Sequence, residues 1–175
     1  TPFIYYGEEI GMRDIPIRKK EDVKDPVGKT DWPLNKGRDG CRSPMQWNNA
    51  TNAGFSQESP WLPVNDNYTE RNVAQQTNDP NSLLNFFKTL IEIRKNEPAL
   101  QRGDFTPLVV DPRFILAYIR KLDNERVMVV LNFSSRNLNF DLPEGIWISL
   151  FDNATPFNQS LKLAPYQVVL LKHKS

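Results

Sequence analysis

The stretch TPFIYYGEEIGM occupies residues 1–12, and it decides what kind of fold the chain can adopt. Residues 2–6 are mostly aromatic and β-branched, a composition that favours a buried strand. Gly7 interrupts this run, and the acidic pair Glu8 and Glu9 follows it. We therefore predict a buried strand over 2–6 that ends at a polar rim.

The chain changes character after this predicted strand. Residues 11–79 are rich in Pro, Asn, Gly and charged residues and show no sustained helical or strand period. Ordering a loop costs about 1–2 kcal/mol of backbone entropy per residue, so a loop this long is either functional or a disordered linker. The Trp residues within the loop and the motif at 38–47 favour a functional loop over a disordered linker.

An amphipathic helix is predicted after Asp79 and Pro80. An Asp side chain can cap the first amides of a helix, and proline fits its first turn. Apolar residues then recur at three- and four-residue spacing, so one face must be buried against a partner. Pro98 is expected to end the helix. The residues on this face are Leu83, Phe86, Phe87, Leu90, Ile91 and Arg94.

Beyond Gly103 the pattern changes to short β-rich segments separated by turn residues. Seven such segments predict an antiparallel sandwich of one or two sheets. We place the boundary between the two parts near 101–104, which gives a first domain over 1–102 and a second over 103–175. The predicted strands are 105–110, 114–121, 126–133, 138–142, 146–151, 160–163 and 166–172.

Composition and charge exclude several classes of function. Lys and Arg total 22 against 21 for Asp and Glu, and the basic residues are spread along the chain. Nucleic acids and anionic membranes require a concentrated basic field. No apolar stretch approaches the roughly 20 residues that cross a bilayer. We therefore predict neither a nucleic-acid partner nor a membrane partner.

Cysteine and histidine usage argues against a metal site. Cys41 is the only cysteine, which excludes an intramolecular disulfide and a site built on several thiolates. His173, the only histidine, is expected to lie in a solvated tail. No metal and no cofactor are predicted. The lack of paired cysteines favours a cytoplasmic protein, although several Asn-x-Ser/Thr sequons leave secretion open.

Two motifs in the chain resemble glycoside hydrolase family 13. The stretch TPFIYYGEEIGM is similar to the segment that ends the eighth barrel strand of that family, Gly-x-Pro-x-Ile-Tyr-Tyr-Gly-x-Glu. The stretch GRDGCRSPMQW at 37–47, followed by NAGFS and PWLPVNDNY, resembles the branch that contains α-glucosidases, oligo-1,6-glucosidases and their isomerising relatives. The likeness covers essentially the whole chain.

The resemblance implies a mixed α/β fold. Residues up to Tyr6 would be the last strand of a (β/α)8 barrel, and the helix from Asn81 would be the last barrel helix. An all-β antiparallel sandwich would follow as the C-terminal domain. Because the chemistry of such barrels lies at the C-terminal ends of the strands, the loop over 11–79 would lie on the face that meets substrate.

The resemblance also implies that the catalytic carboxylates lie outside this chain. Retaining glycosidases need a nucleophilic carboxylate and a protonated carboxyl about 5–5.5 Å apart, and in the family these come from earlier strands. Glu8 and Glu9 are neighbours on an extended segment, so they point to opposite faces and cannot flank one bond. We expect no catalytic residue here. The chain is expected to be the C-terminal part of a longer α-glucosidase, inactive without the N-terminal part of the same protein.

Arg42 and Arg38 are the candidate substrate-binding residues. A guanidinium can donate two parallel hydrogen bonds, which suits a carboxylate or adjacent sugar hydroxyls. Arg42 is similar to the family's arginine before Thr/Ser-Pro-Met-Gln-Trp, which binds the non-reducing end of glucose in subsite −1 and so makes the enzyme exo-acting on oligosaccharides. The alternative is that Arg42 only braces the loop. Arg38 is expected to be mainly a structural partner, with Asp39 exposed or capping a turn.

The Trp residues of the loop allow two interpretations. Trp32, Trp47 and Trp61 could stack on sugar rings, or they could anchor the loop by burying large areas. We favour anchoring for Trp47 and Trp61.

Three other functions stay open. Amino-acid-transporter heavy chains share the family's fold without being enzymes, although the intact motif at 38–42 favours an enzyme. A glucosyl-transferring or isomerising enzyme is not distinguished from a hydrolase by these residues. A free-standing carbohydrate-binding module over 104–175 ranks last, because its predicted strands offer few exposed aromatic pairs.

Overall fold

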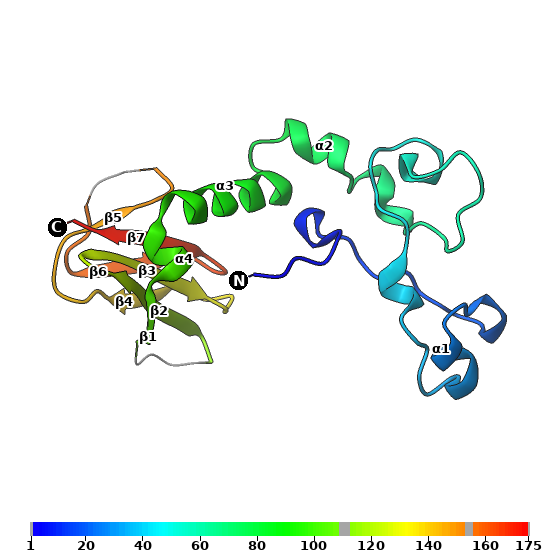
Figure 1. Cartoon of the computed structure of the whole chain (residues 1–175), viewed down its shortest axis with the longest axis horizontal. Coiled ribbons are helices and arrows are strands. Elements are labelled where there is room, and N and C mark those ends of the chain that lie inside the picture. The colour runs from blue at the N-terminus through cyan, green and yellow to red at the C-terminus, as the bar shows by residue number, and fades with distance from the viewer. Residues whose placement is uncertain (1, 109–112, 153–155, 175) are drawn as a thin grey trace. The chain divides into compact units, whose positions relative to one another are not determined.

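The structure is a computed structural model that describes residues 2–108, 113–152 and 156–174. The chain divides into two compact units, Thr1–Leu90 and Ile91–Ser175 (Figure 1). This division falls inside helix α3 (Leu83–Asn96). The domain boundary at 102/103 stays a proposal from the sequence.

The first unit consists of short helices and turns around two small apolar clusters. One cluster joins Ile15, Ile17, Val23 and Leu62, and the other joins Ile10, Met45 and Leu84. Its α-helices are α1 (Pro26–Asp31), α2 (Val73–Asn78) and the first part of α3. Its 3-10 turns are Glu8–Ile10, Lys20–Asp22, Asp39–Arg42, Thr51–Gly54 and Asp66–Thr69.

Residues 2–6 carry no regular secondary structure, in contrast to the predicted strand. A strand requires a neighbour for its backbone hydrogen bonds, and the described residues offer none to this segment. Phe3 is 94% exposed, and Ile4, Tyr5 and Tyr6 are nearly half exposed. The segment is therefore an apolar surface without a sheet around it.

The long loop is ordered by side chains that bind distant backbone groups. Gln46, which is fully buried, donates to the carbonyl of Arg71, and Arg71 donates to the carbonyl of Gly11 at 2.9 Å. Gln76 donates to the carbonyl of Ile10 at 2.9 Å. The bonds to Gly11 and Ile10 join segments at least 60 residues apart in sequence. The loop is therefore not a disordered linker.

Helix α3 begins later than predicted. Ser82 is its cap, because its Oγ accepts from the amide of Asn85 at 3.2 Å. Asp79 instead caps the preceding turn by accepting from the amide of Asn81 at 2.9 Å. Pro98 does not end α3, which stops at Asn96, but opens the next helix, α4 (Pro98–Arg102). Proline fits that first position because its missing N–H would have no helical partner there.

The apolar face of α3 is not buried as predicted. Among the described residues, Leu84 is the buried side chain of this helix. Phe86, Phe87 and Leu90 are half-buried, and Leu83 and Ile91 are exposed.

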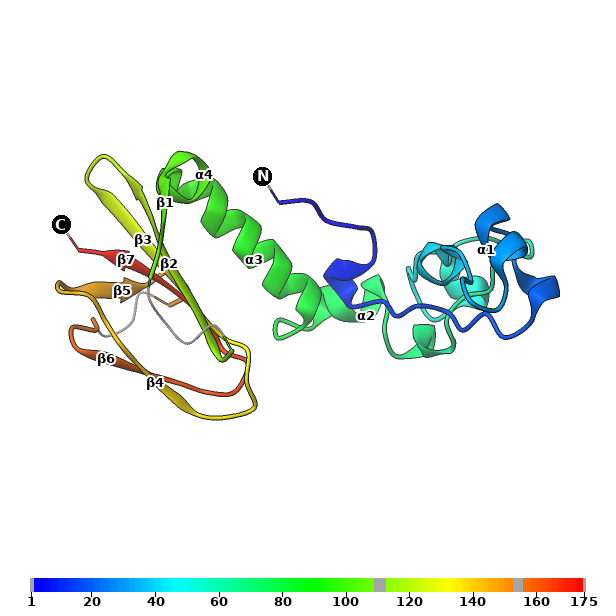
Figure 2. The same ribbon diagram turned by 90° about the horizontal axis from the view of Figure 1, so that it is seen from below.

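The second unit is the predicted antiparallel sandwich. Five strands form a sheet in the order β1-β2-β3-β7-β5, and β4 and β6 form a second sheet. Figure 2 shows this pair facing the larger sheet. The strands are β1 (Asp104–Pro107), β2 (Ile115–Leu122), β3 (Glu125–Asn132), β4 (Leu138–Asp141), β5 (Trp147–Ser149), β6 (Ser160–Leu163) and β7 (Val168–His173). Residues 109 and 110 of the first predicted strand lie outside the described residues.

The core of the sandwich lies between its two sheets. Met128, Val130 and Leu171 from the large sheet pack with Phe140 and Leu163 from the small one. Alternation along each strand puts these side chains on one face, which is why the period in the sequence predicted the strands well.

Helix α4 packs on the opposite face of the large sheet, where Ala99 and Leu100 are buried. Gly103 follows this helix directly. A Cβ at this position would lie 2.5 Å from the carbonyl oxygen of Ala99 and 2.7 Å from that of Lys121. The close approach of helix and strand therefore requires glycine.

His173 does not lie in a solvated tail, which corrects the expectation from the sequence. It is in β7, where its ring packs edge-on against Trp147 with centroids 5.1 Å apart. Arg126 Nη2 lies 2.9 Å from His173 Nε2. Desolvation and then the nearby Arg126 charge lower the pKa of His173. The ring is thus a structural contact of the sheet.

Leu171→Ala should destabilise the second unit by about 2–5 kcal/mol, because it removes a fully buried side chain and leaves a cavity. The matched control is Leu116→Ala on β2, where the side chain is 41% exposed and the loss should stay below about 1 kcal/mol. The free energy of unfolding in urea measures both. Equal losses would show that the core does not lie where the structure has it.

Candidate functional site

Arg42 lies at the end of the 3-10 turn Asp39–Arg42. The hydroxyl of Tyr6 donates to the carbonyl of Ser43 at 2.9 Å and lies 3.4 Å from that of Cys41. Both residues that flank Arg42 are thus bound to the end of segment 2–6. Desolvation, followed by the neighbouring Tyr5 and Cys41, raises the pKa of Tyr6, which keeps this hydroxyl a donor. The backbone on either side of Arg42 therefore lies beside the segment that resembles the last barrel strand.

Asp25 brings the two candidate arginines together. Its Oδ2 lies 3.4 Å from Arg42 Nη1 and 3.8 Å from Arg38 Nε. The same oxygen accepts from the amide of Arg38 at 3.2 Å, and Oδ1 accepts from the amide of Val27 at 2.9 Å. The Asp25 side chain is only 2% exposed. Sequence reasoning missed this carboxylate, although an Asp before Pro26 is a usual helix start.

Asp39 is fully buried, so the expectation that it could be exposed is wrong. Its Oδ2 accepts from the amides of Lys24 at 2.6 Å and Asp25 at 3.0 Å. These amides lie just before α1 and need an acceptor when buried. Oδ1 of Asp39 has no hydrogen-bond partner in the described part of the chain. The carboxylate of Asp39 therefore holds the backbone that carries Asp25.

The environment of Asp25 keeps it ionised. Desolvation acts to raise its pKa, but hydrogen bonds from the amides of Arg38, Val27 and Gly28, together with the charge of Arg42, outweigh it. The pKa of Asp25 therefore lies below its usual value. At neutral pH the carboxylate is a fixed negative charge under two arginines.

The two arginines differ in how firmly they are held. The side chain of Arg38 is 72% exposed, so its long contact with Asp25 is a weak surface pair. The side chain of Arg42 is 34% exposed, which leaves part of the guanidinium open while one nitrogen faces Asp25. Arg42 is therefore the better placed of the two to donate to a ligand.

A small cavity of about 220 Å³ lies beside this segment. It is lined by Tyr5, Tyr6, Gly7, Glu8, Met12, Arg13, Asp14, Gly40, Cys41 and Ser43. Both sequence neighbours of Arg42 contribute to its wall. Within the described ranges, no group of three or more His, Cys, Asp or Glu residues could hold a metal ion.

The loop tryptophans differ from expectation. Trp47 is 49% exposed and Trp61 is 55% exposed, so neither is a buried anchor. Trp32 instead packs on the cluster that contains Leu62, with the Lys36 ammonium 5.4 Å from its ring centroid. Trp32 thus anchors the loop, while the other two offer aromatic surface.

Two family models match the chain. Residues 1–103 match the α-amylase catalytic domain, and residues 105–170 match the C-terminal domain of maltogenic amylase. The chain belongs to the α-amylase family of glycoside hydrolases, and the resemblance to glycoside hydrolase family 13 is confirmed. The mixed fold, the end of a barrel followed by a β-sheet domain, is also confirmed.

Similar sequences come from bacterial enzymes. The oligo-1,6-glucosidase of Parageobacillus thermoglucosidasius is 38% identical over 163 residues, which cover 83% of this chain and 29% of that protein. The probable oligo-1,6-glucosidase 2 of Bacillus subtilis is 38% identical over 161 residues, 82% of this chain and 29% of that protein. The chain thus spans less than a third of the length of these relatives.

Similar solved structures include a trehalulose synthase and an isomaltulose synthase. The trehalulose synthase MutB from Pseudomonas mesoacidophila MX-45 matches 99% of this chain and 36% of its own, with a TM-score of 0.86 and 35% identity. The isomaltulose synthase PalI from Klebsiella sp. LX3 matches 99% of this chain and 35% of its own, with a TM-score of 0.86 and 34% identity. None of the helices within the described residues has the length and apolar character of a membrane span.

The lowered pKa of Asp25 predicts how stability depends on pH. A carboxyl whose pKa is depressed in the folded state stabilises the fold above its unfolded pKa, near 3.8, and this contribution is lost as pH falls through the lower folded value. The wild type should therefore lose more stability between about pH 5 and pH 2 than Asp25→Asn. Urea unfolding followed by tryptophan fluorescence measures the difference.

The control for this prediction is Asp31→Asn, which changes an exposed carboxylate on α1. It should keep the full acid-induced loss of the wild type. If Asp25→Asn also kept that loss, Asp25 would not be the ionised group that the contacts indicate.

Proposed function

We propose that this chain is the C-terminal part of a retaining, exo-acting α-glucosidase that hydrolyses terminal α-linked glucose from oligosaccharides of the maltose or isomaltose type. The names of the similar glucosidases support this activity. In this proposal Arg42 contacts the terminal glucose, and the N-terminal part of the same protein supplies the catalytic carboxylates.

The observation that carries the proposal is the pairing of Arg42 with Asp25 beside Tyr6. A guanidinium has five N–H donors in a fixed plane, and the contact with Asp25 uses one nitrogen. The remaining donors can bind adjacent hydroxyls of a glucose ring. A buried anion behind the guanidinium keeps it from turning away when no sugar is bound. Asp25 is thus a positioning residue for Arg42.

Pre-positioning matters because ordering a flexible side chain during binding costs about 0.5–1.5 kcal/mol for each side chain. Arg42 is already fixed by Asp25, and its backbone neighbours are fixed by Tyr6. An arginine that closes the end of the pocket would admit only the terminal sugar, which is the basis of the proposed exo action.

The acidic pair near the start of the chain has another use. Glu8 accepts from the amide of Tyr5 at 3.2 Å, and Glu9 accepts from the amide of Gly7 at 2.8 Å. Both carboxylates bind backbone amides, one at the end of segment 2–6 and one in the turn that follows it. This geometry supports the proposal that neither cleaves a glycosidic bond and that the chain alone is inactive.

A second candidate function is glucosyl transfer or isomerisation by the same site. This alternative is supported by the solved trehalulose and isomaltulose synthases, which match nearly the whole chain. Product analysis separates the two: a hydrolase releases glucose from sucrose or maltose, whereas an isomerase returns a rearranged disaccharide. We further propose a cytoplasmic location, because the single cysteine offers no disulfide.

In the complete protein, Arg42→Ala should lower kcat/KM for maltose or isomaltose about 10- to 100-fold, since a hydrogen bond to a charged group contributes about 1.5–3 kcal/mol. Steady-state kinetics measure this. Arg38→Ala is the matched control and should change kcat/KM less than about threefold, because its ion pair is exposed. Unchanged kinetics for Arg42→Ala would reduce Arg42 to a brace of the loop.

The chain expressed alone should not hydrolyse nitrophenyl α-glucoside, because it lacks the pair of carboxylates that the reaction requires. Release of nitrophenol is the assay. Turnover by this chain, abolished by a change at Glu8 or Glu9, would place the chemistry within it.

A further inference from the structure

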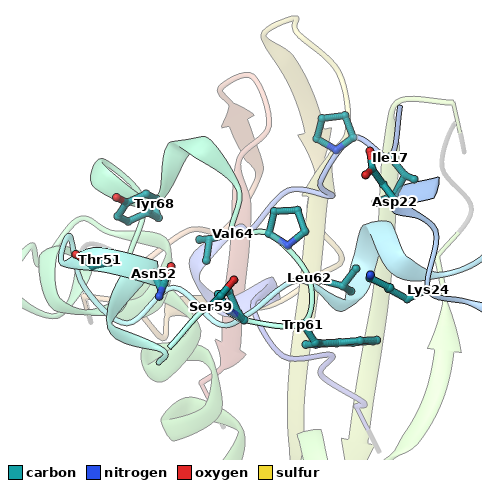
Figure 3. Close-up of a pocket in the computed structure, with 13 residues that line it drawn as sticks. Ile17, Asp22, Lys24, Thr51, Asn52, Ser59, Trp61, Leu62, Val64 and Tyr68 are labelled. Carbon is teal, nitrogen blue, oxygen red and sulfur yellow. The ribbon is translucent and has the colours of Figure 1, made fainter. Parts of the chain in front are cut away.

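A second hollow in the first unit shares no lining residue with the cavity beside Tyr6 and has no role in the proposed reaction. Its volume is about 720 Å³, and Figure 3 shows residues that line it. Three segments form it, at 16–24, 51–52 and 59–68. The lining residues that matter below are Ile17, Asp22, Lys24, Ser59, Trp61 and Leu62.

The hollow has an apolar floor and an aromatic border. Ile17 and Leu62 are buried and belong to one core cluster. Trp61 is 55% exposed, and Figure 3 shows its indole edge-on along the lower border, so that one face of the ring is turned to the other lining residues. A flat apolar face that solvent can reach favours a ligand that also has a flat apolar face.

The rim of the hollow carries polar side chains that are free to bind a ligand. Within the described residues, the side chains of Asp22, Lys24 and Ser59 make no hydrogen bond or ion pair. One is an acceptor, one a donor and one a hydroxyl that does both. The balance of one acid and one base disfavours phosphates and cationic ligands alike. Neutral ligands with many hydroxyls suit it best.

The hollow is also pre-formed. The amide of Lys24 is bound by the buried Asp39, and Val23 packs with Leu62 in the core. Asn52 donates to the carbonyls of Ser56 and Glu58 at 3.1 and 3.0 Å, which closes the segment before Ser59. Because these walls are fixed before binding, the protein loses less conformational entropy when a ligand binds.

We propose that this hollow is a second sugar-binding site, which holds one pyranose unit of an oligosaccharide against Trp61. The C–H face of the ring lies on the indole, and hydroxyls at its edge donate to Asp22 and accept from Lys24. The site binds sugar without reacting with it. Only the choice of an α-linked glucose oligosaccharide rests on the proposed function.

The test uses the complete protein and a thio-linked isomaltotriose, in which a sulfur replaces each glycosidic oxygen so that the ligand resists cleavage. Titration calorimetry on Arg42→Ala isolates the hollow, because that change weakens the proposed active-site contact. We expect one remaining binding event. Adding Trp61→Ala should weaken it about tenfold or more, since the stacking face is lost.

Two matched variants complete the test. Trp47→Ala removes a tryptophan of similar exposure that does not line the hollow, and it should leave the binding unchanged. Trp61→Phe keeps a flat apolar face and should retain most of the affinity. Trp61→Ala alone should keep the wild-type kcat on nitrophenyl α-glucoside.

Binding that is unaffected by Trp61→Ala, or absent from the Arg42→Ala protein, overturns the second site. Failure of the proposed function would look different. It would appear as absent hydrolysis by the complete protein, or as unchanged kinetics in Arg42→Ala, and neither result depends on Trp61.

Discussion

The ion pair between Arg42 and the buried carboxylate of Asp25 is the constraint on which the rest of the first unit depends. Asp25 caps α1, accepts from the backbone next to Arg38 and faces Arg42, so one side chain joins a helix, a turn and the candidate contact. A buried charge is tolerated only when it is paired and hydrogen-bonded. The loop must therefore close around Asp25, and this closure carries Arg42 to the end of segment 2–6.

The sequence predicted the second unit better than the first. Alternating side chains gave seven strands close to their observed bounds, because each strand has one face in a core that this chain itself provides. The strand at 2–6 and the buried face of α3 could not be confirmed in the same way. Both need partners for their apolar sides, and the described residues do not supply them.

In the candidate site, too, the sequence could not predict contacts between distant side chains. Arg42 and Arg38 could be selected from a motif, but Asp25 lies 17 residues before Arg42, within a stretch without any period. Its role depends on a tertiary contact that no local pattern encodes. The prediction that Asp39 is exposed or caps a turn was incomplete for a related reason. The buried amides that require Asp39 as their acceptor belong to Lys24 and Asp25, which lie 15 and 14 residues earlier in the chain.

The contact between Arg42 and the terminal glucose can be tested most directly by a crystal structure of the complete protein with glucose bound. In that structure Arg42 should lie about 2.7–3.2 Å from two hydroxyl oxygens of the sugar while its other side still faces Asp25. A glucose held by other residues, with the Arg42 guanidinium turned to bulk solvent, would contradict it.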